Sequence, residues 1–276
     1  MDSKVLEFNS GFILKSKSEH IPSTVQPDTL FTFTDKLEYL LPWISSAMIP
    51  PRYCVEDISY LHIPNFKKLA YPMKCFCDIN LHRLGEHLGW YGNYGIAFSK
   101  EWGMRNRIQP VQYINPDSEL CKDFAASFSE ALNIDASTQS KQTLILKDFL
   151  LHELMYYKPY SGAIKRRTSD TEEEKCFTDE CEWRYIPNVT ALGYQQVYRD
   201  GNILNTGILS DINNSMSGRK EISLTFTYGD IKYIIVKDIS DLNIIIENIN
   251  RLEIEDIQKY HLVSKIIVWE QSKGDF

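Results

Sequence analysis

The sequence has no apolar run long enough to cross a bilayer, since the longest, at residues 233–236 and 266–269, are far shorter than a membrane span. Residues 1–14 lack the basic start and the apolar stretch of a secretory signal. We therefore expect a cytoplasmic protein without a membrane partner. In that compartment the six cysteines are expected to be reduced thiols rather than a disulfide framework.

The sequence also lacks an excess of positive charge. The chain carries 30 Lys and Arg against 37 Asp and Glu, a net charge of −7. This balance argues against a broad surface for nucleic acid or anionic membranes and favours a protein partner, although a single cleft can be basic on an acidic body. Walker-type loops, HExxH and GxSxG are absent, so the common signatures of nucleotide hydrolases, zinc proteases and serine hydrolases are missing.

What the sequence does contain is ordinary globular composition, with 43% hydrophobic and 24% charged residues. Predicted strands cluster with helices between them, without a strict βαβ rhythm, which favours an α+β fold. We expect one domain with a central, mostly antiparallel sheet and flanking helices. A polar N-terminal segment covers residues 1–28, and the domain covers 29–276. The charged stretch at about 165–179 is interpreted as a solvated loop within it.

The predicted elements follow from apolar periodicity. Alternation predicts a first strand at Leu30–Thr34, and Asp35 stands where the N-cap of the following helix is expected. Further strands are predicted at residues 73–79, 96–98, 111–114, 182–186, 222–227, 232–236 and 264–268. Helices are predicted at about 81–88, 117–132, 141–157 and 241–251, and a short helix is predicted to begin at residue 99.

Cysteine and histidine residues form the first group of candidate functional residues. Sulfur and imidazole at short spacing are typical zinc ligands. However, alternation places Cys75 and Cys77 on one face of a strand, where thiols pack as small hydrophobes. His82 and His87 are five residues apart on a predicted helix and point apart, which is poor for shared ligation. We therefore predict no metal site.

Aromatic residues and glycines form the second group, at residues 90–95. Gly92 and Gly95 could let the backbone approach a flat ligand while Tyr91 or Tyr94 stacks on it. The alternative is a tight turn at the end of a strand, with its aromatic rings in the core. The glycine spacing of a dinucleotide fingerprint is absent.

Charged residues form the other two groups. In a strand, Glu180, Glu182 and Arg184 point to one face, where one carboxylate could bind a ribose hydroxyl and the other lie near a nucleophile. The alternative is a wet sheet face with a weak Glu–Arg pair. A basic triplet at residues 165–167 could meet phosphates. It is followed by three glutamates at 172–174, a pattern more typical of a self-neutralising, solvated segment.

Several of these segments resemble the AbiGi family of abortive phage-resistance proteins. The matching text includes PMKCFCDINL at 72–81, YGNYGIAFSKEWG at 91–103 and EWRYIP at 182–187, with further matches at 30–34, 51–57 and 230–236. The resemblance implies the antitoxin side of a two-gene abortive-infection system whose toxin resembles a nucleotidyltransferase. It therefore implies a protein partner, either a toxin or a phage component.

A more distant resemblance is to DarT-type ADP-ribosyltransferases, in which a first-strand His holds the NAD ribose and a late-strand Glu positions its 2′-hydroxyl. The matching positions here are Thr32 and Glu182, and Thr32 has no imidazole. This resemblance implies NAD as cofactor, Glu182 with its neighbour Glu180 as catalytic carboxylates, and Thr32, Tyr94 and Arg184 as cofactor-binding residues. Two hypotheses stay open: a defence component that acts by binding, and an ADP-ribosyltransferase-like effector that modifies nucleic acid or protein.

Overall fold

The computed structural model describes residues 21–134, 140–165, 171–199 and 206–275. Its main sheet is mostly antiparallel, as predicted, and only the β14–β15 pair is parallel among the described strands of this sheet. In spatial order the strands are β15 (Ile266–Val268), β14 (Ile231–Val236), β5 (Tyr94–Phe98), β1 (Leu30–Thr34), β4 (Lys68–Cys77), β11 (Glu182–Tyr185) and β6 (Gln109–Pro110), with β3 (Arg52–Asp57) and β12 (Tyr198–Arg199) also paired to β4.

Strand β4 connects the two halves of the sheet. Its first residues pair with β3 and β12, and its last residues pair with β11 and with β1. Smaller two-stranded pairs lie outside the main sheet: β2 (Met48–Ile49) with β13 (Leu224–Thr225), β7 (Gln112–Ile114) with β8 (Tyr157–Pro159), and β9 (Ser161–Lys165) with β10 (Glu172–Cys176).

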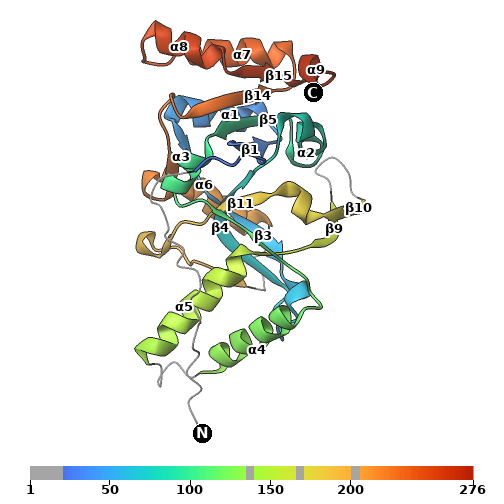
Figure 1. Cartoon of the computed structure of the whole chain (residues 1–276). Coiled ribbons are helices and arrows are strands. Elements are labelled where there is room, and N and C mark those ends of the chain that lie inside the picture. Colours follow the sequence, from blue (N-terminus) through green and yellow to red (C-terminus); the bar gives the residue numbers. More distant parts are fainter. Residues whose placement is uncertain (1–20, 135–139, 166–170, 200–205, 276) are drawn as a thin grey trace.

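The helices gather at the two ends and on both faces of this sheet (Figure 1). Helices α7 and α8 lie at one end of the molecule, and α4 and α5 lie at the opposite end. The α-helices are α1 (Leu37–Ser46), α2 (Leu84–Tyr91), α3 (Lys100–Arg105), α4 (Glu119–Asn133), α5 (Lys141–Tyr156), α6 (Thr206–Met216), α7 (Ile239–Asn250), α8 (Asp256–Val263) and α9 (Trp269–Ser272).

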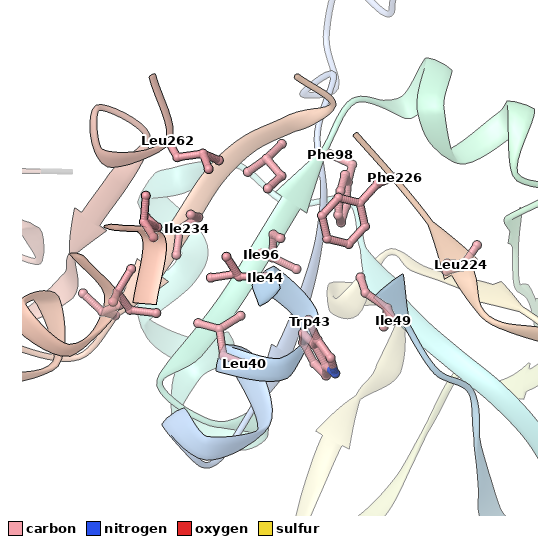
Figure 2. Packing of buried hydrophobic residues seen from close by; sticks show 14 of the residues in the cluster. Leu40, Trp43, Ile44, Ile49, Ile96, Phe98, Leu224, Phe226, Ile234 and Leu262 are labelled. Atoms are coloured by element: carbon pink, nitrogen blue, oxygen red, sulfur yellow. The ribbon is translucent and has the colours of Figure 1, made fainter. Parts of the chain in front are cut away.

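The largest core lies between α1 and α7 and one face of strands β5 and β14. Leu40 and Ile44, four residues apart on α1, point at Ile96 and Ile234 of these strands (Figure 2). The other face of the same strands is covered by α2, whose Leu84 packs in a second cluster of buried residues. Both faces are thus buried, which explains the nearly continuous apolar sequence of β14.

A separate core forms where α4 and α5 cover the first half of β4. Phe124 and Phe128 of α4 and Leu154 of α5 pack with Tyr71 and Met73 of that strand. Because β4 contributes to both cores, its ten residues tie the two halves of the molecule together.

The α+β class, the first strand and most predicted elements are confirmed, and three details are corrected. Lys36, not Asp35, is the N-cap of α1, and it makes no side-chain cap bond. The strand predicted at 222–227 is limited to Leu224–Thr225, because a 3₁₀ turn, η7 (Lys220–Ile222), precedes it. The charged stretch at 165–179 is not a simple loop, since in its described part β10 pairs with β9 and is followed by the turn η4 (Phe177–Glu180).

Candidate functional site

A cleft of about 590 Å³ opens where strands β1 and β4 separate. In these two fully described strands, the register joins only Phe31 to Cys77, whereas all five residues of β1 pair with β5. Beyond that pair, residues 32–35 and 73–76 line the cleft instead of pairing with each other. The position is therefore set by backbone pairing, at the junction of the two halves of the sheet.

The glycines of the aromatic segment pack against the β1 residues that line one wall of this cleft. A Cβ on Gly92, which has a φ of 112°, would lie 2.3 Å from the carbonyl oxygen of Thr34. A Cβ on Gly95 would lie 2.6 Å from the ring of Phe33. Both glycines thus serve the close packing of the chain against β1, rather than the approach of a ligand.

The two glutamates singled out in the sequence reach the cleft from neighbouring elements. Glu182 is the first residue of β11 and lies opposite Cys77, so both point to the same face of the sheet. Glu180 ends η4, and Cys181 between them adopts a left-handed backbone with φ of 44°. This kink, not a continuous strand, brings the second carboxylate beside the first. Both glutamates line the cleft.

Arg184 holds Glu182 from within the protein. Its Nε donates to Glu182 Oε1 at 2.8 Å and one Nη to Glu182 Oε2 at 3.3 Å. The other contacts of the guanidinium go to Tyr71 Oη at 2.7 Å, the carbonyl oxygen of Met155 at 2.7 Å and Glu56 Oε2 at 2.9 Å. Only 1% of Arg184 is exposed, so the predicted wet sheet face is wrong.

Two lysines complete the network. Lys158 of β8 donates to Glu182 Oε2 at 2.5 Å and also contacts Glu180. Lys175 of β10 donates to Glu180 Oε1 at 2.7 Å and to the Tyr91 hydroxyl at 3.0 Å, while its ammonium lies 4.6 Å from the ring centroid of Trp90. The Tyr91 hydroxyl itself donates to Glu180. We call Glu56, Glu180, Glu182, Lys158, Lys175 and Arg184 the ion network, in which three carboxylates balance three cations.

The ion network keeps both cleft carboxylates ionised. Burial alone would raise the pKa of Glu182, but Arg184 and Lys158 hold that pKa well below its usual range. Burial opposes ionisation of Glu180 in the same way, and Lys158 and Lys175 lower its pKa. Neither carboxyl carries a proton near neutral pH, so neither can act as a general acid there.

The structure brings together some of the predicted cofactor-binding residues and separates others. Thr32 lines the same cleft as Glu182, while Arg184 lies behind that carboxylate. Tyr94 is not brought to this cluster. It pairs with Thr34 on the opposite face from Phe31 and donates to Asp241 Oδ2 at 3.0 Å. Of the two tyrosines weighed for stacking, Tyr91 is the one that lines the cleft.

Sequence reasoning missed Lys158, Lys175 and Glu56. Lys175 fell in the stretch interpreted as a solvated loop, and Glu56 lies more than a hundred residues from its partner Arg184. Lys158 offered the one usable signal, because it is a lone cation within the aromatic run at residues 156–160. A lysine in such surroundings needs a buried counter-charge.

The cysteine and histidine residues have other roles. His87 packs against the rings of Phe33 and Tyr91, and burial lowers its pKa to about 4. In the described part of the chain, His, Cys, Asp and Glu side chains nowhere gather in threes as a metal would require.

Arg166 and Arg167 of the basic triplet lie outside the described residues. Among the helices of the described ranges, none is both long and apolar enough to span a membrane.

Comparison with known proteins identifies the relatives of the chain. Residues 47–237 match the family described as "Putative abortive phage resistance protein AbiGi, antitoxin". The chain is 33% identical over 246 residues to the abortive phage resistance protein AbiGi of Lactococcus lactis subsp. cremoris, an alignment covering 82% of this chain and 98% of the relative. No solved structure matches. With the family matched through every strand from β3 to β14, the chain belongs to the AbiGi family of abortive phage resistance proteins.

Proposed function

We propose that this protein is the antitoxin of an abortive-infection system and acts by binding a toxin protein of the same system. The description of its family as an antitoxin supports this role. The net charge of −7 fits a protein partner better than nucleic acid. The single observation that carries the proposal is an exposed apolar surface on α5.

This α5 patch consists of Leu144, Ile145, Leu146 and Phe149. Their exposed fractions are 49%, 60%, 47% and 54%, whereas Leu150 at the next position is 5% exposed. The first two turns of the helix thus extend past the core that covers its second half. Large apolar side chains exposed together on one helix typically mark a protein interaction site, because leaving them in water is unfavourable.

The end of α4 lies beside the α5 patch. Lys147 donates from its ammonium to the carbonyl oxygen of Ile134 at 3.2 Å, and Ile134 is itself exposed. Both helices stand at one end of the molecule, away from α7 and α8 (Figure 1). A partner protein can therefore dock on this end without contacting the cleft.

The internal contacts of Glu182 favour a structural role for this residue over a catalytic one. Three donors already occupy its carboxylate, which offers about four lone-pair sites. About one lone-pair site is thus left for a ribose hydroxyl, on a carboxylate whose charge Arg184 and Lys158 already balance. The ADP-ribosyltransferase hypothesis also needs an imidazole-like donor on β1, and Thr32 lacks it.

Neutralisation of the toxin by patch variants tests the proposal. Ile145→Glu and Phe149→Glu are expected to fold normally, because both side chains are exposed, and to lose toxin binding and rescue of growth when the two genes are expressed together. Ile257→Glu on α8 is the matched control, since Ile257 is 55% exposed and lies at the other end of the molecule. Rescue by the patch variants at the level of the control would contradict the proposal.

The transferase hypothesis has its own measurement. Purified protein incubated with NAD and cell lysate is expected to release no nicotinamide. Release that is lost in Glu182→Gln, in a preparation that circular dichroism shows to be folded, would replace the binding role with an enzymatic one.

A further inference from the structure

We propose that the toxin holds the first two turns of α5 in an apolar groove that surrounds the helix on three sides. This inference rests on the proposed antitoxin role and adds to it the shape of the surface that the partner presents. It follows from the directions in which the residues of the α5 patch point.

The α5 patch extends around most of the helix. Successive residues of an α-helix point about 100° apart, so Leu144, Ile145 and Leu146 together span about 200° of its circumference. All three side chains are at least 47% exposed. Phe149, which follows about one turn later and is 54% exposed, points between Ile145 and Leu146.

Within the described ranges, the remaining side of these turns contacts the rest of the protein. Thr143 and Lys147, four residues apart, are partly buried on that side, and the Lys147 ammonium donates to the carbonyl oxygen of Ile134 at 3.2 Å. Leu150 continues this side into the core and is 5% exposed. The patch is therefore the outer surface of a projecting helix, at the end of the molecule opposite α7 and α8 (Figure 1).

The shape of this surface decides which partner can cover it. A helix that lies on a flat protein surface buries a stripe about 100° wide, so a flat partner would leave Leu144 or Leu146 in water. Pairing with α5 of a second copy has the same limit, because two projecting helices touch along one side of each. An apolar groove encloses all three directions, which is the way amphipathic helices dock in helix-in-groove complexes.

The projecting turns are already helical without a partner. Ser140 is the N-cap of α5, and its hydroxyl accepts from the backbone N–H of Thr143 at 3.1 Å. Leu150 and Leu154 anchor the second half of the helix in the core. Because the helix does not have to form on binding, the toxin gains the apolar contacts without the entropic cost of ordering it.

Toxin binding by variants with a charge on different sides of α5 tests the inference. Leu144→Glu, Ile145→Glu and Leu146→Glu each place a carboxylate in one of the three directions, and glutamate is a good helix former. In calorimetric titrations of the full chain with the purified toxin, we expect each variant to bind at least about tenfold more weakly than wild type, because each would bury a charge in the groove.

The control variant is Ile257→Glu on α8, which should bind the toxin as wild type does. Melting by circular dichroism shows whether each variant is folded, and at any position whose glutamate variant melts early the glutamine variant repeats the titration. Sedimentation of the full chain alone should show a monomer.

Two results would overturn the groove. Affinity that stays near wild type in one or two of the three variants would mean a flatter contact, and toxin binding by α5 would still stand. A dimer that Ile145→Glu dissociates would mean that a second copy covers the patch. Wild-type affinity in all three variants would contradict the groove and the proposed function together, so the failure of one is distinguishable from the failure of both.

Discussion

At the residue scale, the arrangement around Arg184 is the strongest constraint in the molecule. Five polar atoms surround a guanidinium that is 1% exposed. Removing a charge from water is expensive, and only partners on every side make it tolerable. The planar fork of arginine supplies these directions together, which a lysine cannot do.

Breaking the pair is expected to destabilise the fold strongly. Glu182→Gln keeps the shape of the side chain but leaves Arg184 and Lys158 with excess positive charge. We expect the free energy of unfolding to fall by about 3–5 kcal/mol, measured by urea denaturation. Glu119→Gln, at an exposed ion pair on α4, should change it by less than about 1 kcal/mol. Similar losses of unfolding free energy in the two variants would show that the ion network contributes little to stability.

His87 gives a pH dependence with a defined window. Its pKa is about 4 in the folded protein and 6.5 as a free side chain, so the unfolded chain takes up the proton first as pH falls. Stability from the neutral ring is complete above pH 6.5 and is lost toward pH 4, by up to about 1.4 kcal/mol per pH unit. In His87→Gln the slope of unfolding free energy across this window should shrink by that amount. An unchanged slope would mean that other titratable groups cause the pH dependence of stability in this window.

At the scale of elements, the link between α2 and β5 depends on one glycine. The φ of 112° at Gly92 is strained for other residues, and a Cβ would overlap the backbone of Thr34 and Asp35. Gly92→Ala is expected to cost about 1–3 kcal/mol from backbone strain, plus the displacement of β1, as measured by urea denaturation. Gly218→Ala, with open space around it, should be nearly neutral. Equal stability of both variants would mean that the turn rearranges cheaply.

Elements with a strong local pattern were predictable, and those set by distant contacts were not. The alternation of Leu30–Thr34 and the start of a helix at residue 99 are local signals, and both predictions hold to within one residue. The β9–β10 pair was missed, because the five charged residues within 172–179 are typical of a solvated loop. The strand forms there because it pairs with β9, a contact that the local sequence does not indicate. In the candidate site, the sequence placed Glu180, Glu182 and Arg184 close together. It did not indicate that they are buried, because the lysines that pair with the two glutamates come from β8 and β10.

The whole molecule contains two cores that share one strand. All five tryptophans, at residues 43, 90, 102, 183 and 269, lie outside the cluster formed by α4, α5 and the first half of β4. Tryptophan fluorescence therefore reports one half, whereas far-UV circular dichroism also reports α4 and α5. Because β4 joins the halves, we expect coincident urea transitions for the two signals. An earlier dichroism transition would mean that the α4–α5 half unfolds by itself, against the predicted single domain.

The balance of the ion network also limits how this protein can change over generations. Loss of any one of its six charged side chains leaves an unmatched charge in a buried place, so most single substitutions there are expected to be lethal to the fold. Viable descendants must then replace an acid and a base together, or neither. Glu182 and Arg184 should accordingly vary as a pair across the family, whereas Leu144, Ile145 and Phe149 remain free to diversify with whatever partner each lineage meets.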